Sequence, residues 1–255
     1  MRTLKPIHAN RGAAVKYRKQ LDVLIQDMSD SYLYWLTATY RANPPIEIAT
    51  DALPSSDAKK RLNELGKRWM KRFDEMALHI ATLHVNSLTG ITDKAMMNAL
   101  KEAGWTVNFQ ITRAMRDVMG ASIAENVSLI KSIPQQYHTK LEGIVMRNYS
   151  VGKDLFTMRK EIQATYPVTL RRAVLITNDQ TSKLNIAVQN ARHLELGITQ
   201  AKWMHSHAGK EPRPDHVAAN GKIYDIAKGC LISGEYIHPG YLINCRCVSG
   251  AVLPF

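Results

Sequence analysis

The sequence predicts a mainly α-helical protein with long N-terminal helices, a helical middle and a small α+β module with short strands at its C-terminal end. Apolar residues recur every three or four positions through the first two thirds of the chain, as amphipathic helices require. From Ile198 onward the pattern alternates, and glycine and proline separate short extended segments. The 255 residues, 45% of them hydrophobic, suit one large or two modest domains. We predict a helical N-terminal domain over 1–126 and a second domain over 127–255, helical in 127–197 and mixed in 198–255.

Two long helices are predicted first, over residues 12–40 and 56–86. Both carry apolar side chains at helical spacing, and the segment 41–45 contains two prolines that end the first helix. Residues 53–57 supply serine and aspartate caps for the second helix. Two long helices joined in this way indicate an antiparallel pair or a protruding arm.

Shorter helices are expected in the middle of the chain. Gly104 and Gly120 are typical helix ends, and Pro134 favours the end of one helix and the start of another. The segment 165–167 should end a helix that begins near Lys153.

A long helix is then expected from Val168 to about Leu196, closed by Gly197. It contains the polar run TNDQTS, residues 177–182, which competes with helical hydrogen bonding. This run is either a solvent-facing stripe or a helix face turned toward a polar partner or a neighbouring domain.

Three extended segments are predicted in the C-terminal module. They are ITQAKWMHS at 198–206, GKIYD at 221–225 after an Asn-Gly turn pair, and NCRCVSGAVLP at 244–254.

The chain is strongly basic, with 34 lysines and arginines against 22 acidic residues and a formal charge of +12. Such a balance favours an anionic partner, either nucleic acid or an acidic protein surface. The basic clusters are spread along helical sequence, so solvated helix faces are the competing interpretation. No apolar run approaches the roughly 20 residues that span a bilayer, and we expect a protein first used in a cytoplasm.

The cysteines lie close together in the last part of the chain, together with several histidines. A zinc site would combine Cys230, Cys245 and Cys247 with His216 or His238. The one-residue spacing of the Cys-Arg-Cys pair is unusual for such sites, so a packed thiol pair is the alternative. A disulfide within this pair is not expected, because residues i and i+2 of a strand point to one face in parallel.

An enzyme is the rival function. A thiol hydrolase would need Cys245 or Cys247 beside His216, with Asp215 or Asp225 to orient the base. A metal-dependent hydrolase would use the histidines His205, His207 and His216 with the cysteines. The sequence contains no glycine-rich phosphate loop and no His-Glu-x-x-His motif, and we expect no enzymatic activity.

Five segments, in order, resemble the Mu F-like head morphogenesis family, the minor head proteins of tailed bacteriophages. They are VSLIKSIP at 127–134, RRAVLITNDQTSKLN at 171–185, GITQAKW at 197–203, RPDHVAANGKIYD at 213–225 and HPGYLINCRC at 238–247. The motif residues that they carry are Arg172, Asp179, Gln180, Thr181, Trp203, Arg213, His216, Gly221, Asn244, Cys245, Arg246 and Cys247.

The resemblance implies a minor capsid protein present in few copies in the virion, at the portal vertex or inside the head. Its partners would be the portal protein, capsid or scaffold proteins and packaged DNA, with a basic DNA-binding protein as a further alternative. No cofactor is implied, and the motif residues are structural.

In this interpretation INCRC, residues 243–247, is the closing strand of the module. Asn244 satisfies turn backbone, the thiols pack against Trp203, and Arg246 pairs with Asp215 or Asp225.

Overall fold

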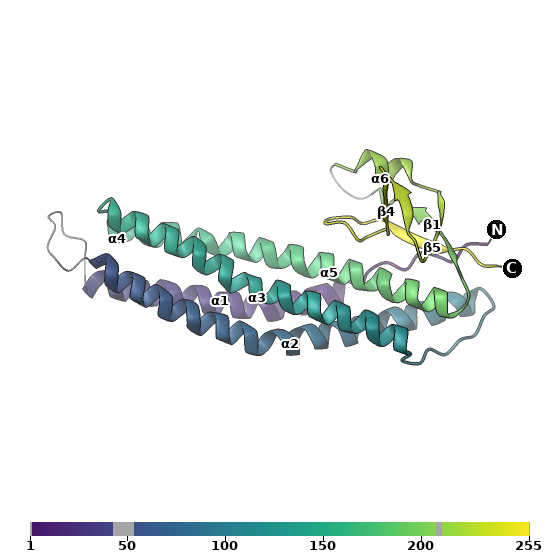
Figure 1. The fold of residues 1–255 in the computed structure, drawn as a ribbon, viewed down its shortest axis with the longest axis horizontal. Coiled ribbons are helices and arrows are strands. Elements are labelled where there is room, and N and C mark those ends of the chain that lie inside the picture. The colour runs from purple at the N-terminus through teal and green to yellow at the C-terminus, as the bar shows by residue number, and fades with distance from the viewer. Residues whose placement is uncertain (1, 43–53, 208–210, 255) are drawn as a thin grey trace. The chain divides into compact units, whose positions relative to one another are not determined.

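The computed structural model describes residues 2–42, 54–207 and 211–254 (Figure 1). The chain forms two compact units. The first unit comprises Met1–Lys16, Ala81–Glu125 and Leu175–Phe255, and the second comprises Tyr17–Ile80 and Asn126–Val174. Each unit contains residues from both predicted domains, 1–126 and 127–255. The two compact units therefore do not coincide with the two predicted domains, which follow one another in the chain.

Long helices dominate the described residues, as the sequence predicts. The helices are α1 (Arg11–Ala42), α2 (Pro54–Glu102), α3 (Arg113–Ser150), α4 (Leu155–Gln163), α5 (Thr165–Glu195) and the short α6 (Pro214–Ala218). Four of them contribute residues to both units. The predicted breaker 41–45 lies mostly outside the described residues, and α2 is longer than the predicted 56–86.

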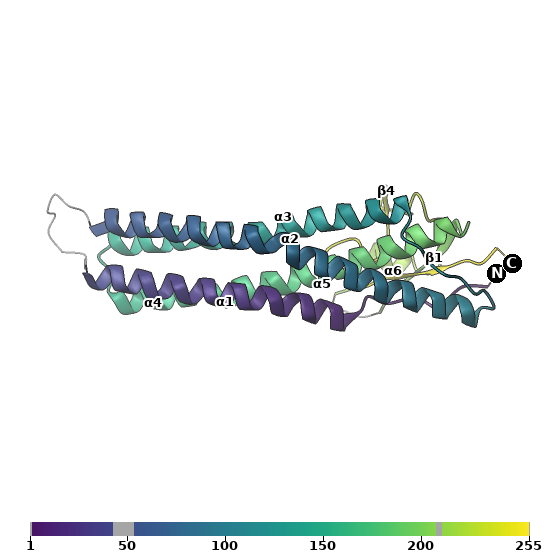
Figure 2. The ribbon, with the colours of Figure 1, turned by 90° about the horizontal axis from the view of Figure 1, so that it is seen from below.

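The second unit is a bundle of α1, α2, α3 and α4 with the start of α5. Buried or partly buried hydrogen bonds join α1 to α3 and the residues after it: Tyr17–Asn126, Tyr137–Ser29, Tyr32–His138 and Tyr40 to the carbonyl of Lys153. Because the partner numbers rise together, α1 and α3 run parallel. The guanidinium of Arg61 lies over the ring of Trp35, which fits the antiparallel arrangement of α1 and α2 visible in Figure 2.

Two predicted helix ends are wrong. Pro134 lies inside α3, and so does Gly120. A helix that continues through proline loses one backbone hydrogen bond, but the apolar face of α3 stays buried across it, with Ile130, Ile133 and Tyr137 at helical spacing. Pro167 likewise lies in the first turn of α5, where the missing N–H costs little.

The first unit carries all the described strands. Strands β2 (Ile223–Asp225), β1 (Gln200–Met204) and β5 (Val248–Ala251) form an antiparallel sheet in that order. Strands β3 (Cys230–Ile232) and β4 (Glu235–Ile237) form a hairpin. Figure 1 shows these strands gathered with α6. The small strand-containing C-terminal region confirms the predicted fold class.

Residues near both ends of the chain take part in the same sheet. Thr3 bridges Val252, and the N–H of Leu4 donates to the carbonyl of Ala251 at 2.8 Å. The N–H of Leu253 donates in turn to the carbonyl of Arg2 at 2.9 Å. This short N-terminal extension was not predicted from the sequence.

Two apolar clusters fill the first unit. One lies around the fully buried Trp203 and joins the strands to Leu4, to Leu100 at the end of α2 and to the cysteines. The other packs Val85 and Leu88 of α2 against residues of α3 and α5. None of the described helices is both long and apolar enough to cross a membrane.

Gly229 is expected to be intolerant of a side chain. Its φ is +93°, and an added Cβ would lie 3.0 Å from the carbonyl oxygen of Ile237, which is backbone and has little freedom to move. Gly229→Ala should therefore lower the free energy of unfolding by at least about 1–2 kcal/mol. The matched control is Gly90→Ala in exposed helical sequence with nothing within 4 Å, which should raise it by about 1 kcal/mol. Urea unfolding of both variants tests the pair, and equal effects would contradict this account.

Candidate functional site

Three predicted side chains of the C-terminal module meet in one buried cluster: His216, Cys245 and Cys247. The Nδ1 atom of His216 lies 3.4 Å from Cys245 Sγ and 3.7 Å from Cys247 Sγ. Their potential ligand atoms all lie within 4.8 Å of one another. The three residues are 2%, 7% and 4% exposed. Among the described residues this group of three is able to hold a metal ion.

Local structure explains how His216 reaches this place. The helix α6 begins after Arg213, whose backbone is extended, and Pro214 occupies the first turn. The carboxylate of Asp215 accepts the N–H of His216 at 2.8 Å. The imidazole then packs at 87° against the ring of Trp203, with the two centroids 5.2 Å apart.

The cysteines are positioned by a turn and not by a strand. Asn244 has a φ of +60°, and the N–H of Cys245 donates to the carbonyl of Leu242 at 2.8 Å. Residues 243–247 therefore precede β5, which begins at Val248. The predicted closing strand INCRC is wrong, because asparagine readily adopts this left-handed conformation and turns the chain inward.

The two thiols are electrostatically unequal. A hydrogen bond from the Cys247 thiol, together with the N–H groups of Cys247 and Gly240, lowers the pKa of Cys245 to about 5. The same thiol hydrogen bond and burial raise the pKa of Cys247.

The other predicted ligands lie elsewhere in the first unit. Cys230 is buried in β3, where burial raises the pKa of its thiol. The Nδ1 atom of His238 lies 3.2 Å from the side-chain amide of Asn190, and burial lowers the pKa of this histidine. Three of the predicted metal ligands therefore form the cluster, and Cys230 and His238 are not part of it. All three cysteines are free.

The predicted packing of both thiols with Trp203 is confirmed, since all three residues belong to one buried cluster. The predicted ion pair of Arg246 is wrong: among the described residues this exposed side chain pairs with neither Asp215 nor Asp225. Those carboxylates instead accept hydrogen bonds from Ser233 and from nearby backbone.

Arg213 and Gly221 support the loops around the cluster. The guanidinium of Arg213 donates to the carbonyl of Ile243 at 2.9 Å and so ties α6 to the cysteine-bearing turn. Gly221 has a φ of +87°, and its N–H donates to the carbonyl of Trp203 at 2.8 Å.

The polar run of α5 faces inward, not toward solvent. Thr177, Gln180 and Thr181 are buried. Gln180 donates to Glu125 at 2.8 Å, and Asp179 pairs with Lys183 at 3.1 Å. The solvent-facing stripe is therefore wrong for these buried residues, and the contact of Gln180 with Glu125 lies within the first unit. Arg172, in the second unit, donates to the hydroxyl of Ser132 at 2.8 Å.

A buried ion-pair network around Arg192 was not predicted from the sequence. Its fully buried guanidinium binds Asp93 through two hydrogen bonds of 2.9 and 2.7 Å and also binds Glu195 and the carbonyl of Gln110. It lies 4.7 Å from the centroid of Phe109. Arg192 lies four residues after Val188, on the apolar face of the predicted helix. This position was the sequence signal that its side chain is buried.

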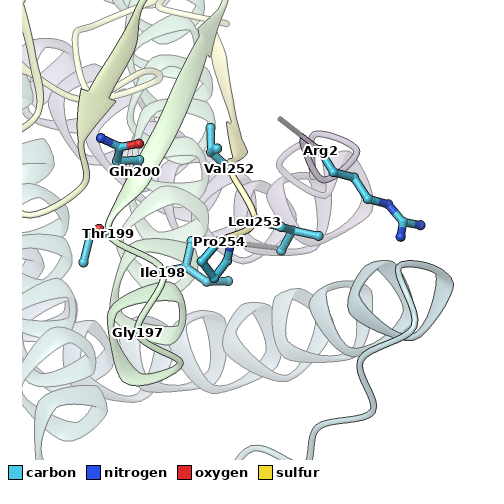
Figure 3. A pocket seen from close by; sticks show the side chains of 8 residues that line it. All are labelled: Arg2, Gly197, Ile198, Thr199, Gln200, Val252, Leu253 and Pro254. Carbon is cyan, nitrogen blue, oxygen red and sulfur yellow. The ribbon is translucent and has the colours of Figure 1, made fainter.

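A second candidate is a cavity of about 300 Å³ in the first unit. Its lining residues are Arg2, Gly197, Ile198, Thr199, Gln200, Val252, Leu253 and Pro254. Figure 3 shows the guanidinium of Arg2 pointing away from Thr199 and Gln200. The cavity therefore gathers no set of reactive side chains.

Comparison with known proteins identifies the part of the chain that contains the cluster. Residues 139–249 match the family model of phage Mu protein F-like proteins. This segment is Mu F-like. The match confirms the resemblance for the four segments between residues 171 and 247, and all twelve motif residues fall within the Mu F-like segment, whereas the segment 127–134 lies outside it. The family description links this segment to phage proteins.

The chain is also similar to a Haemophilus influenzae protein described as "Uncharacterized protein". The two are 38% identical over 138 residues, which is 53% of this chain and 29% of that protein. The chain thus spans less than a third of the length of this relative. No solved structure matches the chain.

Proposed function

We propose that the chain is a minor capsid protein of a tailed bacteriophage, carried in few copies at the portal vertex or in the head interior. It would aid head assembly and the packaging or delivery of DNA after being made in the bacterial cytoplasm. The observation that carries this proposal is the Mu F-like segment.

Charge supports a place close to the packaged genome. The formal charge of +12 favours association with the phosphate backbone, and such contacts need no base recognition. We propose that packaged DNA lies against the protein inside the particle.

The second unit supports a role in protein contacts. Near the end of α1, Tyr34 and Trp35 are exposed and pack edge to face, with centroids 5.1 Å apart. Aromatic side chains are enriched at protein interfaces. We assign contact with portal, capsid or scaffold proteins to the helical part of the chain.

A structural role for the buried cluster suits this proposal better than catalysis. A hydrolase acting on peptide or nucleic acid must bring its substrate to the reacting atoms, whereas His216, Cys245 and Cys247 are almost fully buried. The proposal therefore assigns no enzymatic activity to the chain.

Quantitative peptide counting on purified mature particles tests the proposal. The chain, the portal protein and the major capsid protein would be measured in the same digest against isotope-labelled standards. We expect a fixed ratio of a few copies per portal ring that does not change on further purification.

Absence from both mature particles and DNA-free heads would contradict the proposal. Presence in DNA-free heads alone would contradict the virion role and leave a factor that acts only during assembly. A ratio that varies between preparations would indicate adsorbed protein and would also count against it.

A further inference from the structure

We propose that His216, Cys245 and Cys247 bind one zinc ion in the first unit, through Nδ1 of the histidine and Sγ of each cysteine. This inference concerns the cluster alone and does not depend on the proposed place of the chain in a virion.

The spacing of the donor atoms fits a tetrahedral ion. Zinc–sulfur and zinc–nitrogen bonds of about 2.3 and 2.0–2.1 Å place neighbouring sulfur and nitrogen ligands roughly 3.6 Å apart. The Nδ1 atom of His216 lies 3.4 and 3.7 Å from the two sulfur atoms. The three side chains therefore need little movement to coordinate one ion.

The chemistry of the donors selects the metal. Two thiolates and an imidazole are ligands for zinc and other soft or borderline ions, whereas magnesium and calcium prefer oxygen. Two thiolates also balance the charge of a divalent cation. An uncompensated pair of thiolates among residues as buried as Trp203 would be costly, and the ion removes that cost.

The surrounding backbone is arranged as a support for sulfur ligands. The N–H of Gly240 donates to Cys245 Sγ at 3.3 Å. Gly240 has a φ of +79°, and a Cβ there would lie 3.4 Å from the carbonyl oxygen of Cys247 and from Ile186. Hydrogen bonds of this kind fix the direction of metal ligands and tune their affinity.

The cluster also determines how many ligands the protein supplies to the ion. Among residues 2–42, 54–207 and 211–254 the cluster contains three donors. Three protein ligands leave the fourth tetrahedral position to a water molecule. We therefore expect a bound zinc with two sulfur ligands, one nitrogen ligand and one water ligand.

Metal analysis of the full 255-residue chain is the first test. Protein purified without chelator should contain one zinc ion per chain, and Cys245→Ser, Cys247→Ser and His216→Gln should each lose most of it. Cys230→Ser is the matched control, because Cys230 is buried in the same apolar cluster but outside the donor set, and it should retain the metal. Zinc retained by all three ligand variants, or lost equally in the control, would overturn the proposal.

Cobalt substitution tests the same site without any mutation. Reduced wild-type protein freed of metal should bind one Co²⁺ per chain, with thiolate-to-cobalt charge-transfer absorption and the intense d–d bands of a tetrahedral ion. Added zinc should displace the cobalt and abolish both signals. Failure to bind cobalt, or a weak octahedral spectrum without charge transfer, would overturn the proposal even if the variants fold poorly.

Discussion

Replacement of Arg192 by alanine is expected to lower the free energy of unfolding by about 3–5 kcal/mol. The guanidinium is fully buried, and its removal leaves Asp93 and Glu195 facing one another without a cation. The carbonyl of Gln110 and the face of Phe109 lose their partner at the same time. Urea unfolding followed by circular dichroism measures the effect.

Two further variants separate charge from geometry. Arg192→Lys keeps the charge but loses the planar fork that binds Asp93 through two hydrogen bonds, so it should be intermediate. Lys5→Ala removes an exposed pair with Glu102 in the same unit and should change the free energy of unfolding by no more than about 1 kcal/mol. An Arg192→Ala variant no less stable than Lys5→Ala would show that the network contributes little.

Acidification should destabilise the first unit through His84 and His193. Burial lowers the pKa of each from 6.5 to about 4. Because the unfolded chain takes up these protons first, the stabilisation is complete above about pH 6.5 and is lost as the pH falls toward 4. At 1.36 kcal/mol per pH unit, each histidine should cost about 2 kcal/mol at pH 5.

The pH dependence can be assigned with matched substitutions. His193→Gln removes a buried group whose ring nitrogens have no partner in the described part of the chain, and it should flatten the profile between about pH 7 and 5. His79→Gln, at an exposed position of α2, is the control for the loss of a histidine from the chain. If His193→Gln retains the full wild-type slope, the assignment to this histidine is wrong.

Helix positions were readily predicted because amphipathic spacing repeats over many turns. The helix end before Gly197 was also predicted well, since its φ of +73° is one that favours glycine. The helix end predicted at Pro134 was wrong. The low helix propensity of proline is outweighed there, because Ile133 and its apolar neighbours are buried on both sides of it.

The site was predicted in part. Cysteine and histidine content indicated a cluster, and the structure selected His216 with Cys245 and Cys247. The sequence could not show that Cys230 lies outside the cluster. Which residues form the cluster depends on how α6 and the turn at Asn244 approach each other. The network of Arg192 was missed for a similar reason: its acidic partner Asp93 lies on another helix.

The pairing of Thr3 with Val252 affects the order in which the protein can fold. On the ribosome, Thr3 and Leu4 are synthesised long before their partners Val252 and Ala251. These contacts of the sheet therefore cannot form until Val252 has been synthesised, and they then join very distant positions of the chain. Helical segments can form earlier because their contacts are local. Until then Leu4 lacks its partner Ala251, and the nascent chain exposes an open strand edge on which chaperones can act.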